Sequence, residues 1–296
     1  MPKLSPSEML PGIIKSKITE YNYYLKHVRS LAVSSINYYC LTAKNFLIWF
    51  NQRSAQINLK KLLLQDIEDY ICVVGKNVGH RTLFNVITAL RSFFRFCFLC
   101  REISTRFDTQ IDTPRVYREE KLPPALDWNT VCALLQSIDR STPIGKRDYA
   151  MLLLIATYGL RANEIVNLKL DDIDWRSMRL RINQHKTFKT LLLPLTEDAS
   201  KAIIEYLQHG RPLVHYREIF VRHNLPQGIL KPISVTDVFN SRSRRSGLSI
   251  PYQGPHCLRH SYAVYLLRQG VSIKTIGDLL GHKNLQSTYI YMRLNL

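Results

Sequence analysis

Long apolar runs are scarce in this sequence. The longest, Ala150–Leu160, is interrupted by Thr157 and Gly159 and falls short of the about 18 apolar residues that span a bilayer. The N-terminus carries three prolines within its first 11 residues and lacks the apolar core of a secretory signal peptide. We therefore expect no membrane-spanning helix, no membrane partner and a cytoplasmic protein.

Cysteine is also sparse, with 6 residues in 296. Cys97 and Cys100 form a C-x-x-C pair, but no second pair and no pair of histidines follows at the spacing of a zinc site. The pair lies in a strongly apolar helical stretch, which favours buried helix cysteines over a metal or redox site. In a cytoplasmic protein the thiols should be reduced. We predict neither a metal ion nor another cofactor.

Acidic residues are few beside basic ones. The chain has 23 Asp and Glu against 41 Lys and Arg, a net charge of +18. Such an excess predicts a polyanionic partner, nucleic acid first and an acidic membrane surface second. The length of 296 residues allows one large domain or two ordinary ones, and an apolar content of 46% is enough for a sizeable core.

The first part of the chain follows the periodicity of helices. After a Pro- and Ser-rich segment at 1–14, which we expect to be loose, residues 15–107 carry four amphipathic runs joined by short polar loops. The runs are Ile18–Leu31, Ser34–Gln52, Gln65–Val74 and Arg81–Cys100. They predict a small helical bundle. Its basic residues form either a solvated face or, as the overall charge favours, a face toward DNA. The candidates for DNA contact are Lys44, Arg81, Arg91 and Arg95.

Residues 108–121 lose the apolar period, which indicates a linker to a second, mixed unit at 122–296. Three helices are predicted in the last forty residues, and four others at Asp127–Asp139, Lys146–Tyr158, Glu197–His209 and Val235–Ser246. Met178, Leu180 and Ile182 alternate with polar residues, which predicts a strand with one exposed face and a hairpin partner at Leu191–Leu195. The basic end of the fourth helix adds three candidates for DNA contact: Arg242, Arg244 and Arg245.

The segment Tyr158–Ile165 lies between two predicted helices and carries Gly159, Arg161 and Glu164. Gly159 permits a tight turn. Arg161 stands near the N-terminus of the next helix, where backbone N–H groups and the helix dipole favour an anion. Glu164 is close enough to position Arg161. The alternative is an ordinary helix–helix corner with a surface Arg–Glu pair.

The last forty residues hold a second set of polar residues. His256 and Arg259 are three apart and share one helical face, where an Arg beside a His suits a phosphate. Gly281 and His282 follow, and Tyr291, a candidate nucleophile, comes nine residues after that histidine. Taken one at a time, each motif has an ordinary structural alternative. The His-x-x-Arg pair is then a surface or N-cap feature, the Gly-His pair a helix C-cap with a solvated histidine, and Tyr291 a core tyrosine.

In their order and spacing, the G-L-R-x-x-E corner, the His-x-x-Arg pair, the Gly-His pair and Tyr291 resemble the signature of the tyrosine recombinases, or phage-type integrases, and of their Xer-like members in particular. The resemblance implies a mainly α fold with a small antiparallel β hairpin or sheet. An N-terminal helical bundle, the SAM-like core-binding domain that clamps DNA, would precede an α+β catalytic domain. The resemblance also implies a catalytic lysine in the hairpin RINQHKTFKTLLLPL, which matches at Lys186, with Lys189 as the nearby alternative.

The catalytic set implied by the resemblance is Arg161, Lys186, His256, Arg259, His282 and Tyr291, with Glu164 in support. In such a set, the two arginines neutralise the nonbridging oxygens of a phosphodiester and Tyr291 attacks the phosphorus. Lys186 protonates the leaving 5′-oxygen, and His256 is a candidate acceptor for the tyrosine proton. Tyr289, two residues from Tyr291, points to another side of a helix and is assigned to packing.

The implied function is site-specific DNA recombination, in which strands are cleaved and rejoined through a 3′-phosphotyrosyl intermediate and a Holliday junction. It would serve integration, excision or resolution. The alternatives are DNA relaxation as by a type IB topoisomerase and a regulator that binds DNA without catalysis. The implied partners are duplex DNA with a short inverted-repeat site and further copies of the chain. Only five residues follow Tyr291, too few to hold protomers together alone, so we expect a monomer in free solution and a tetramer on DNA.

Overall fold

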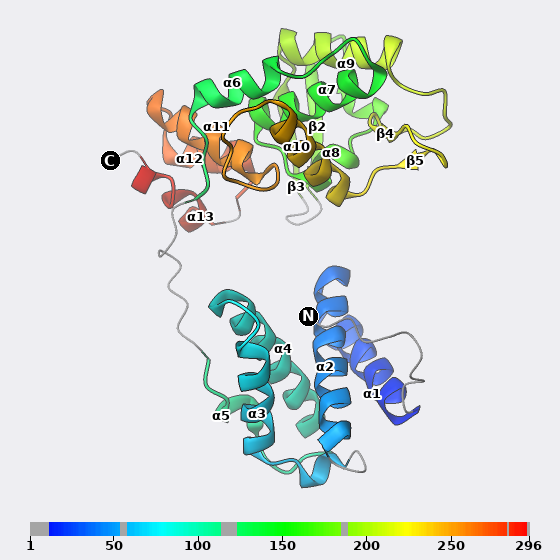
Figure 1. The fold of residues 1–296 in the computed structure, drawn as a ribbon, viewed down its shortest axis with the longest axis vertical. Coiled ribbons are helices and arrows are strands. Elements are labelled where there is room, and N and C mark those ends of the chain that lie inside the picture. The colour runs from blue at the N-terminus through cyan, green and yellow to red at the C-terminus, as the bar shows by residue number, and fades with distance from the viewer. Residues whose placement is uncertain (1–11, 54–57, 114–122, 185–188, 283, 295–296) are drawn as a thin grey trace. The chain divides into compact units, whose positions relative to one another are not determined.

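The structure, a computed structural model, describes residues 12–53, 58–113, 123–184, 189–282 and 284–294. It divides into two compact units, Met1–Arg118 and Glu119–Leu296, whose elements are labelled in Figure 1. Each unit has a hydrophobic core of its own.

The N-terminal unit is a helical bundle. Its elements are α1 (Gly12–Tyr23), the π-helix η1 (Tyr24–Val28), α2 (Val33–Arg53), the 3-10 turn η2 (Leu59–Lys61), α3 (Leu64–Gly75), α4 (His80–Leu99) and α5 (Phe107–Gln110). α2 packs against α4, α1 packs on α2, and α3 packs on α4. Phe46 of α2 and Phe93 and Phe94 of α4 are fully buried where the apolar stripes of the helices meet. The four predicted helical runs are confirmed.

The bundle extends beyond its predicted limits at both ends. α1 begins at Gly12, inside the segment predicted to be loose, because Ile14 is buried in the bundle core. α5 lies in the predicted linker, and Phe107 and Ile111, four residues apart, are buried in the same core. The linker prediction is therefore wrong for this part. The rest of the loose terminus and of the linker, 1–11 and 114–121, lies outside the described residues.

α4 is the one described helix that is long and apolar enough to cross a bilayer by length and composition, with a mean hydropathy of 1.3. The sequence did not predict this property of α4, because polar residues interrupt its apolar runs. In the bundle, however, α4 packs a buried stripe into the core, including Phe93, Phe94 and Cys97. Cys97 is buried as predicted, whereas Cys100, the residue after α4, is exposed, so the pair is not one buried cluster.

The C-terminal unit places helices around a small antiparallel sheet. Its helices are α6 (Trp128–Gln136), α7 (Pro143–Tyr158), α8 (Ala162–Val166), α9 (Glu197–His209), α10 (Pro232–Arg245), α11 (His256–Arg268), α12 (Ile273–Leu280) and α13 (Gln286–Tyr289), with 3-10 turns η3 (Leu170–Asp172) and η4 (Met292–Leu294). Its strands are β1 (Ile173–Asp174), β2 (Arg179–Gln184) and β3 (Lys189–Pro194) in one sheet, and β4 (Val221–Arg222) and β5 (Gly228–Ile229) in another. The predicted mainly α fold with a small antiparallel sheet is confirmed.

The predicted hairpin forms β2 and β3 of a sheet ordered β1-β2-β3, antiparallel throughout. Leu180 and Ile182 face the core, while Arg179 and Arg181 face out, which is the predicted alternation. Met178 was predicted to belong to the strand, and this is wrong. It has a φ of 48° and lies exposed in the turn before β2. The two-residue strands β1, β4 and β5 are too short to show an alternation and were not predicted.

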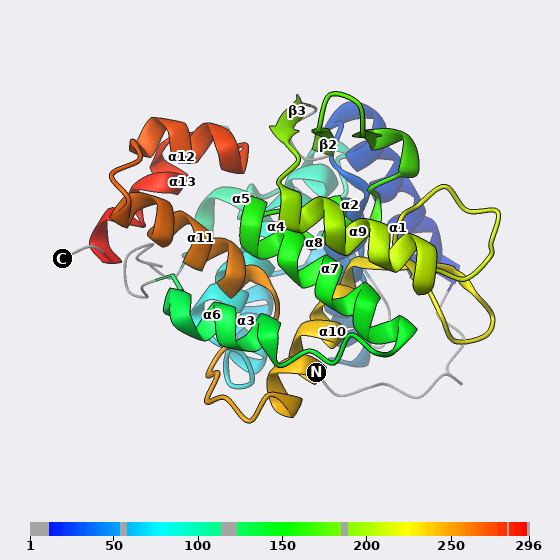
Figure 2. The ribbon, with the colours of Figure 1, turned by 90° about the horizontal axis from the view of Figure 1, so that it is seen from above.

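Two clusters of buried side chains stabilise the C-terminal unit. In the main core, α7 packs against α9 and α11. A smaller cluster joins α11 to α12 and contains Ala263, Ile276, Leu280 and Tyr291. Figure 2 shows α11, α12 and α13 gathered side by side. This smaller cluster positions the candidate nucleophile.

Candidate active site

The corner between α7 and α8 presents Arg161. α7 ends at Tyr158, and Gly159 follows with a φ of 64°, a left-handed conformation that closes a helix. Arg161 is the N-cap of α8, and its backbone N–H and its Nη1 donate to Glu164 Oε2 (2.8 Å) and Oε1 (2.7 Å). The Glu164 side chain is 4% exposed. This buried carboxylate therefore holds the half-buried Arg161 guanidinium in one place.

Arg259 meets this corner from α11. It is buried and donates hydrogen bonds to the carbonyl oxygens of Gly159 and Leu280, the latter at 2.6 Å. Burial, with a smaller contribution from the positive charge of Arg161, lowers the pKa of Arg259 to about 10, so the group stays charged at neutral pH. Two guanidinium groups beside the single carboxylate of Glu164 have an excess of positive charge that a phosphate would neutralise.

Tyr291 is buried where the positive charges of these two arginines act on it. Its side chain is 1% exposed, and its hydroxyl oxygen lies 2.9 Å from Nδ1 of His260. Burial raises the pKa of Tyr291, and the positive charges of Arg259 and Arg161 oppose that rise. A negative charge on the tyrosine oxygen is thus expensive in a dry site but favoured by both neighbouring cations.

His282 lies close enough to Arg259 and Arg161 for their charges to act on it. It follows Gly281, which ends α12 in the left-handed conformation with a φ of 62°, and its Nδ1 is 2.8 Å from Oγ1 of Thr288 in α13. Burial lowers the pKa of His282 to about 4, and Arg259 and Arg161 act in the same direction. The imidazole is therefore neutral at neutral pH and can donate one hydrogen bond to an oxyanion.

His256 is the first residue of α11 and is exposed. It borders an apolar groove lined by Leu160, Ala162, Pro232, Ile233, Thr236 and Pro255. Its ring centroid lies 6.3 Å from that of His260. The His256–Arg259 spacing therefore does bring both residues to one end of α11, with Arg259 buried inside the site and His256 at its rim.

The β2–β3 hairpin reaches this region through Gln184. That side chain is buried, and a Cβ on Gly281 would collide with its amide. Gln184 pairs with Lys189, the first residue of β3. Lys186, the predicted general acid, lies between them and outside the described residues. The hairpin is thus anchored beside His282, and Lys186 and Lys189 both remain candidates.

His260 was not among the site residues predicted from the sequence, although it contacts the Tyr291 hydroxyl. The signal was present, since His260 stands one helical turn after His256 and extends the His-x-x-Arg motif along the same side of the helix. Tyr289 was predicted to be a packing residue, and this is wrong. It is 46% exposed, whereas Tyr291 is buried.

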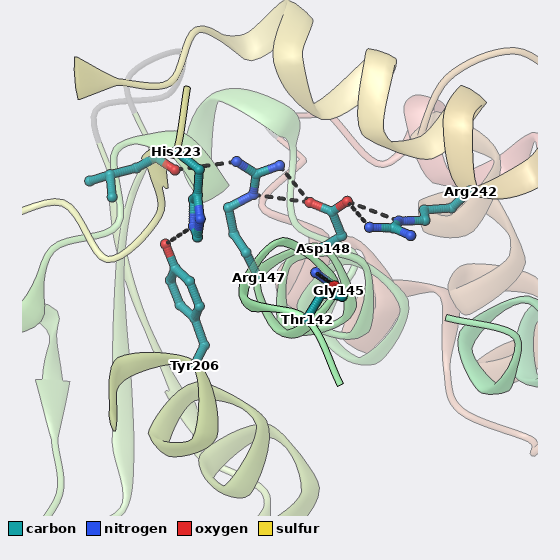
Figure 3. Close-up of polar contacts among 8 residues, drawn as sticks. Thr142, Gly145, Arg147, Asp148, Tyr206, His223 and Arg242 are labelled. Carbon is teal, nitrogen blue, oxygen red and sulfur yellow. Dashed lines mark hydrogen bonds and ion pairs between the residues drawn. The ribbon is translucent and has the colours of Figure 1, made fainter. Parts of the chain in front are cut away.

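Arg242, a predicted DNA contact, is buried instead (Figure 3). Its Nε and Nη2 donate to Oδ2 of Asp148 at 2.9 and 2.7 Å, while Nε and Nη2 of Arg147 donate to Oδ1 at 3.0 and 2.7 Å. The Arg242 residue is only 9% exposed. The prediction is wrong because Arg242 stands two helical turns after Val235 on the buried stripe of α10.

The other predicted DNA contacts differ in exposure. Arg81, Arg95, Arg244 and Arg245 are exposed, whereas Lys44 and Arg91 are half-buried. Nη2 of Arg91 donates to the carbonyl oxygen of Ile111 at 2.8 Å. Arg91 thereby joins α4 to the end of α5 and has a structural role. The four exposed arginines are the better candidates for contacts to a DNA backbone.

Both units match known family models. The model of the phage integrase family matches residues 125–296, and that of the phage integrase N-terminal SAM-like domain matches residues 18–101. The chain belongs to the phage integrase family. Among the relatives of this integrase, the putative integrase/recombinase y4rA of Sinorhizobium fredii is 34% identical over 288 residues, which cover 97% of this chain and 69% of the relative. The tyrosine recombinase XerD of Listeria innocua is 30% identical over 280 residues, 93% of this chain and 92% of the relative.

Solved integrase structures share the fold. The XerH site-specific recombinase bound to palindromic difH substrate, a post-cleavage complex, matches with a TM-score of 0.73 and 21% identity over 98% of this chain and 88% of that one. A lambda integrase dimer (residues 75–356) bound to a COC′ core site matches with a TM-score of 0.71 and 17% identity over 94% of each chain. Membership of the family makes this integrase a site-specific DNA recombinase of the tyrosine type.

Proposed function

We propose that this recombinase cleaves duplex DNA with Tyr291 as the nucleophile and keeps the broken strand as a 3′-phosphotyrosyl link. The observation that carries the proposal is the burial of the Tyr291 hydroxyl where two fixed arginines, Arg161 and Arg259, act on it. A scissile phosphate bound by the same two guanidinium groups would stand next to the attacking oxygen. Such positioning and charge neutralisation are the main contributions to phosphoryl transfer.

The roles of the remaining residues follow from their placement. Glu164 holds Arg161, and Thr288 orients the neutral His282, whose ring N–H donates to a nonbridging oxygen. The leaving 5′-oxygen needs a proton, and a lysine of the hairpin, Lys186 or Lys189, would supply it. Because the phosphotyrosyl link conserves the energy of the phosphodiester, another 5′-hydroxyl can replace the tyrosine without ATP. No metal ion or other cofactor is assigned to this chemistry.

The larger assembly is part of the proposal. The helical bundle within 15–113 and the catalytic unit from 122 to 296 would clamp a duplex, with contacts from the exposed Arg81 and Arg95 of the first and Arg244 and Arg245 of the second. Two protomers would occupy a short inverted-repeat site, and four would exchange strands through a Holliday junction in the cytoplasm. Two relatives support this reading: XerH bound to a palindromic substrate, and a lambda integrase tetramer bound to a Holliday junction.

A covalent trap tests the proposed function. Sites are first selected from a randomised duplex library by binding and sequencing, and a duplex of the selected sequence is then nicked close to the cleavage position so that religation fails. The wild-type protein should form an adduct that survives denaturing electrophoresis. Tyr291→Phe should form none while binding the same duplex, because affinity comes from many phosphate contacts.

The exposed tyrosine is the matched control. Tyr289→Phe should form the adduct at the wild-type rate. An adduct in Tyr291→Phe that is lost in Tyr289→Phe would move the nucleophile by two residues. Binding without any adduct in the wild-type protein would favour a regulator, and an adduct without strand exchange between two duplexes would favour topoisomerase-like relaxation.

A further inference from the structure

His260 is the described partner of the Tyr291 hydroxyl. It stands in α11, the residue after Arg259, and its Nδ1 lies 2.9 Å from the hydroxyl oxygen, with the two ring centroids 5.6 Å apart. Tyr291 is 1% exposed and His260 is half-buried. A hydroxyl in this position has little access to water, so a protein group at hydrogen-bond distance is the natural acceptor of its proton when the oxygen attacks.

The charge state of His260 suits it to receive that proton. Burial, followed by the charges of His256 and Arg259, lowers the pKa of His260 to about 4, so the ring is neutral at neutral pH. With its own proton on Nε2, a neutral imidazole offers the lone pair of Nδ1 to the tyrosine O–H. Among the described residues, the groups that face His260 are His256 and Arg259 of α11, His282 after α12, and Tyr291.

We propose that His260 is the general base of the cleavage reaction, an inference that rests on Tyr291 being the nucleophile. As the tyrosine oxygen forms its bond to phosphorus, its O–H bond breaks and the proton moves to Nδ1 of His260. The bond from phosphorus to the 5′-oxygen breaks, and that oxygen takes a proton from the hairpin lysine. In religation His260 returns its proton to the departing Tyr291 oxygen.

The bound phosphate makes this transfer feasible. In the free protein the neighbouring cation Arg259 opposes a charge on His260. A phosphodiester between the guanidinium groups, gaining negative charge in the transition state, would favour the imidazolium instead. The same phosphate thus strengthens the base at the moment when Tyr291 must lose its proton.

His260→Asn separates proton transfer from positioning. Asn keeps a polar group near the position of Nδ1 but cannot take the proton. The rate of adduct formation in a single turnover is measured on the nicked duplex from about pH 6 to about pH 10, the ordinary pKa of tyrosine. We expect His260→Asn to bind DNA as tightly as the wild type and to react about 10²- to 10⁴-fold more slowly at neutral pH. The deficit should shrink toward high pH, where the hydroxyl ionises without a base.

A more acidic nucleophile supplies the second readout. With 3-fluorotyrosine at position 291, whose hydroxyl ionises more readily, the deficit of His260→Asn should also shrink at neutral pH. A residue that only positions the ring would give a deficit that neither pH nor fluorine changes. That result would overturn the proposal. So would a rate for His260→Asn within about threefold of the wild-type rate, because loss of a general base costs far more.

Two further histidines, His223 and His256, serve as the control and as the competing candidate in this experiment. His223 also contacts a buried tyrosine, Tyr206, with 3.3 Å between Nε2 and the hydroxyl, but lies outside the site, so His223→Asn should react at the wild-type rate. If His256→Asn shows the pH-dependent, fluorine-relieved deficit and His260→Asn does not, the base is His256 and our assignment is wrong. A wild-type protein that forms no adduct would instead refute the proposed function, and this inference with it.

Discussion

At the scale of single residues, the two arginines of the site are held in different ways. Arg161 is paired with a carboxylate, Glu164, and its guanidinium is half-buried. Arg259 is buried and bonded to the carbonyl oxygens that end α7 and α12. Removing Arg161 should therefore affect mainly the phosphate. Removing Arg259 should also loosen the packing of α12, because those carbonyl groups lose their donor.

The general acid can be identified at this scale. Lys186→Ala should cleave ordinary DNA about 10²- to 10⁴-fold more slowly and recover on a duplex whose 5′-bridging oxygen is sulfur, since a thiolate leaves without a proton. Adduct formation on the two substrates is the measurement. Arg161→Ala is the control that should not recover, because in the proposed mechanism Arg161 stabilises the nonbridging oxygens. Rescue of Lys189→Ala in place of Lys186→Ala would assign the acid to Lys189.

At the scale of elements, α11 connects the two cores of the catalytic unit. Its residues Cys257 and Leu258 belong to the main core, and Ala263 and Val264 to the smaller cluster with Tyr291. Arg259 and His260 lie between these two sets. The order of residues along one helix thus places both Arg259, the proposed phosphate-binding cation, and His260, the partner of the proposed nucleophile, at the junction of the two cores.

The two half-buried histidines of this region make its stability sensitive to acid. His260 and His282 have a pKa of about 4 in the folded protein, against 6.5 for a free histidine. Between these values the unfolded chain binds more protons, so the contribution of the two histidines to the free energy of unfolding should be constant above about pH 7 and fall as the pH drops toward 4. Thermal unfolding at each pH tests this. His282→Asn should flatten the curve in that window, and an unchanged slope would contradict the prediction.

Figure 3 shows two buried ion pairs of Asp148: the pair with Arg242 joins α7 to α10, and the pair with Arg147 lies within α7. Asp148→Ala would leave the guanidinium groups of Arg147 and Arg242 buried without their carboxylate. We expect the free energy of unfolding, measured in urea, to fall by about 3–5 kcal/mol. Adding Arg242→Met should restore part of that loss, since it removes one of the two stranded charges.

A surface pair is the matched control for this experiment. Arg217 also forms an ion pair with an aspartate, Asp171, but both side chains are more than half exposed. Asp171→Ala should leave the free energy of unfolding nearly unchanged, because water solvates the freed arginine. Equal losses for Asp148→Ala and Asp171→Ala would show that burial is not what makes the first pair important.

At the scale of the whole molecule, the net charge of +18 is the property that most affects association between protomers and binding to DNA. Protomers of like charge repel one another until phosphates neutralise them. Affinity for DNA should accordingly fall steeply as salt is raised, because each phosphate contact releases a counterion. Assembly and DNA binding are then expected to occur together.

Light scattering tests the expected order of assembly. At micromolar concentration without DNA the protein should have the mass of one chain, and a selected inverted-repeat duplex should bring two protomers together. A charge-neutral polymer of similar size is the control and should leave the mass unchanged. A stable dimer or tetramer in the absence of DNA would contradict the prediction and indicate an interface that forms despite the repulsion.

Local patterns in the sequence were sufficient for most elements and for most of the candidate site. The helical runs and the β2–β3 hairpin follow from periodicity, which depends only on neighbours along the chain. The set of Arg161, His256, Arg259, His282 and Tyr291 follows from the resemblance of these spaced motifs to the tyrosine recombinases. Short elements such as β1 and α5 were not predicted, because two to four residues are too few to show a periodic pattern. They form only where a neighbouring strand or core stabilises them.

Burial and pairing between distant residues were decided by the tertiary structure. Arg242 looks like one more surface cation in a basic run, and its pairing with Asp148, 94 residues away, makes its burial tolerable. His260 becomes a candidate base because α11 and the segment after α13 bring it to Tyr291, 31 residues on. Spacing along the chain can indicate which residues share a helix face, but the partner opposite that face depends on how the helices pack.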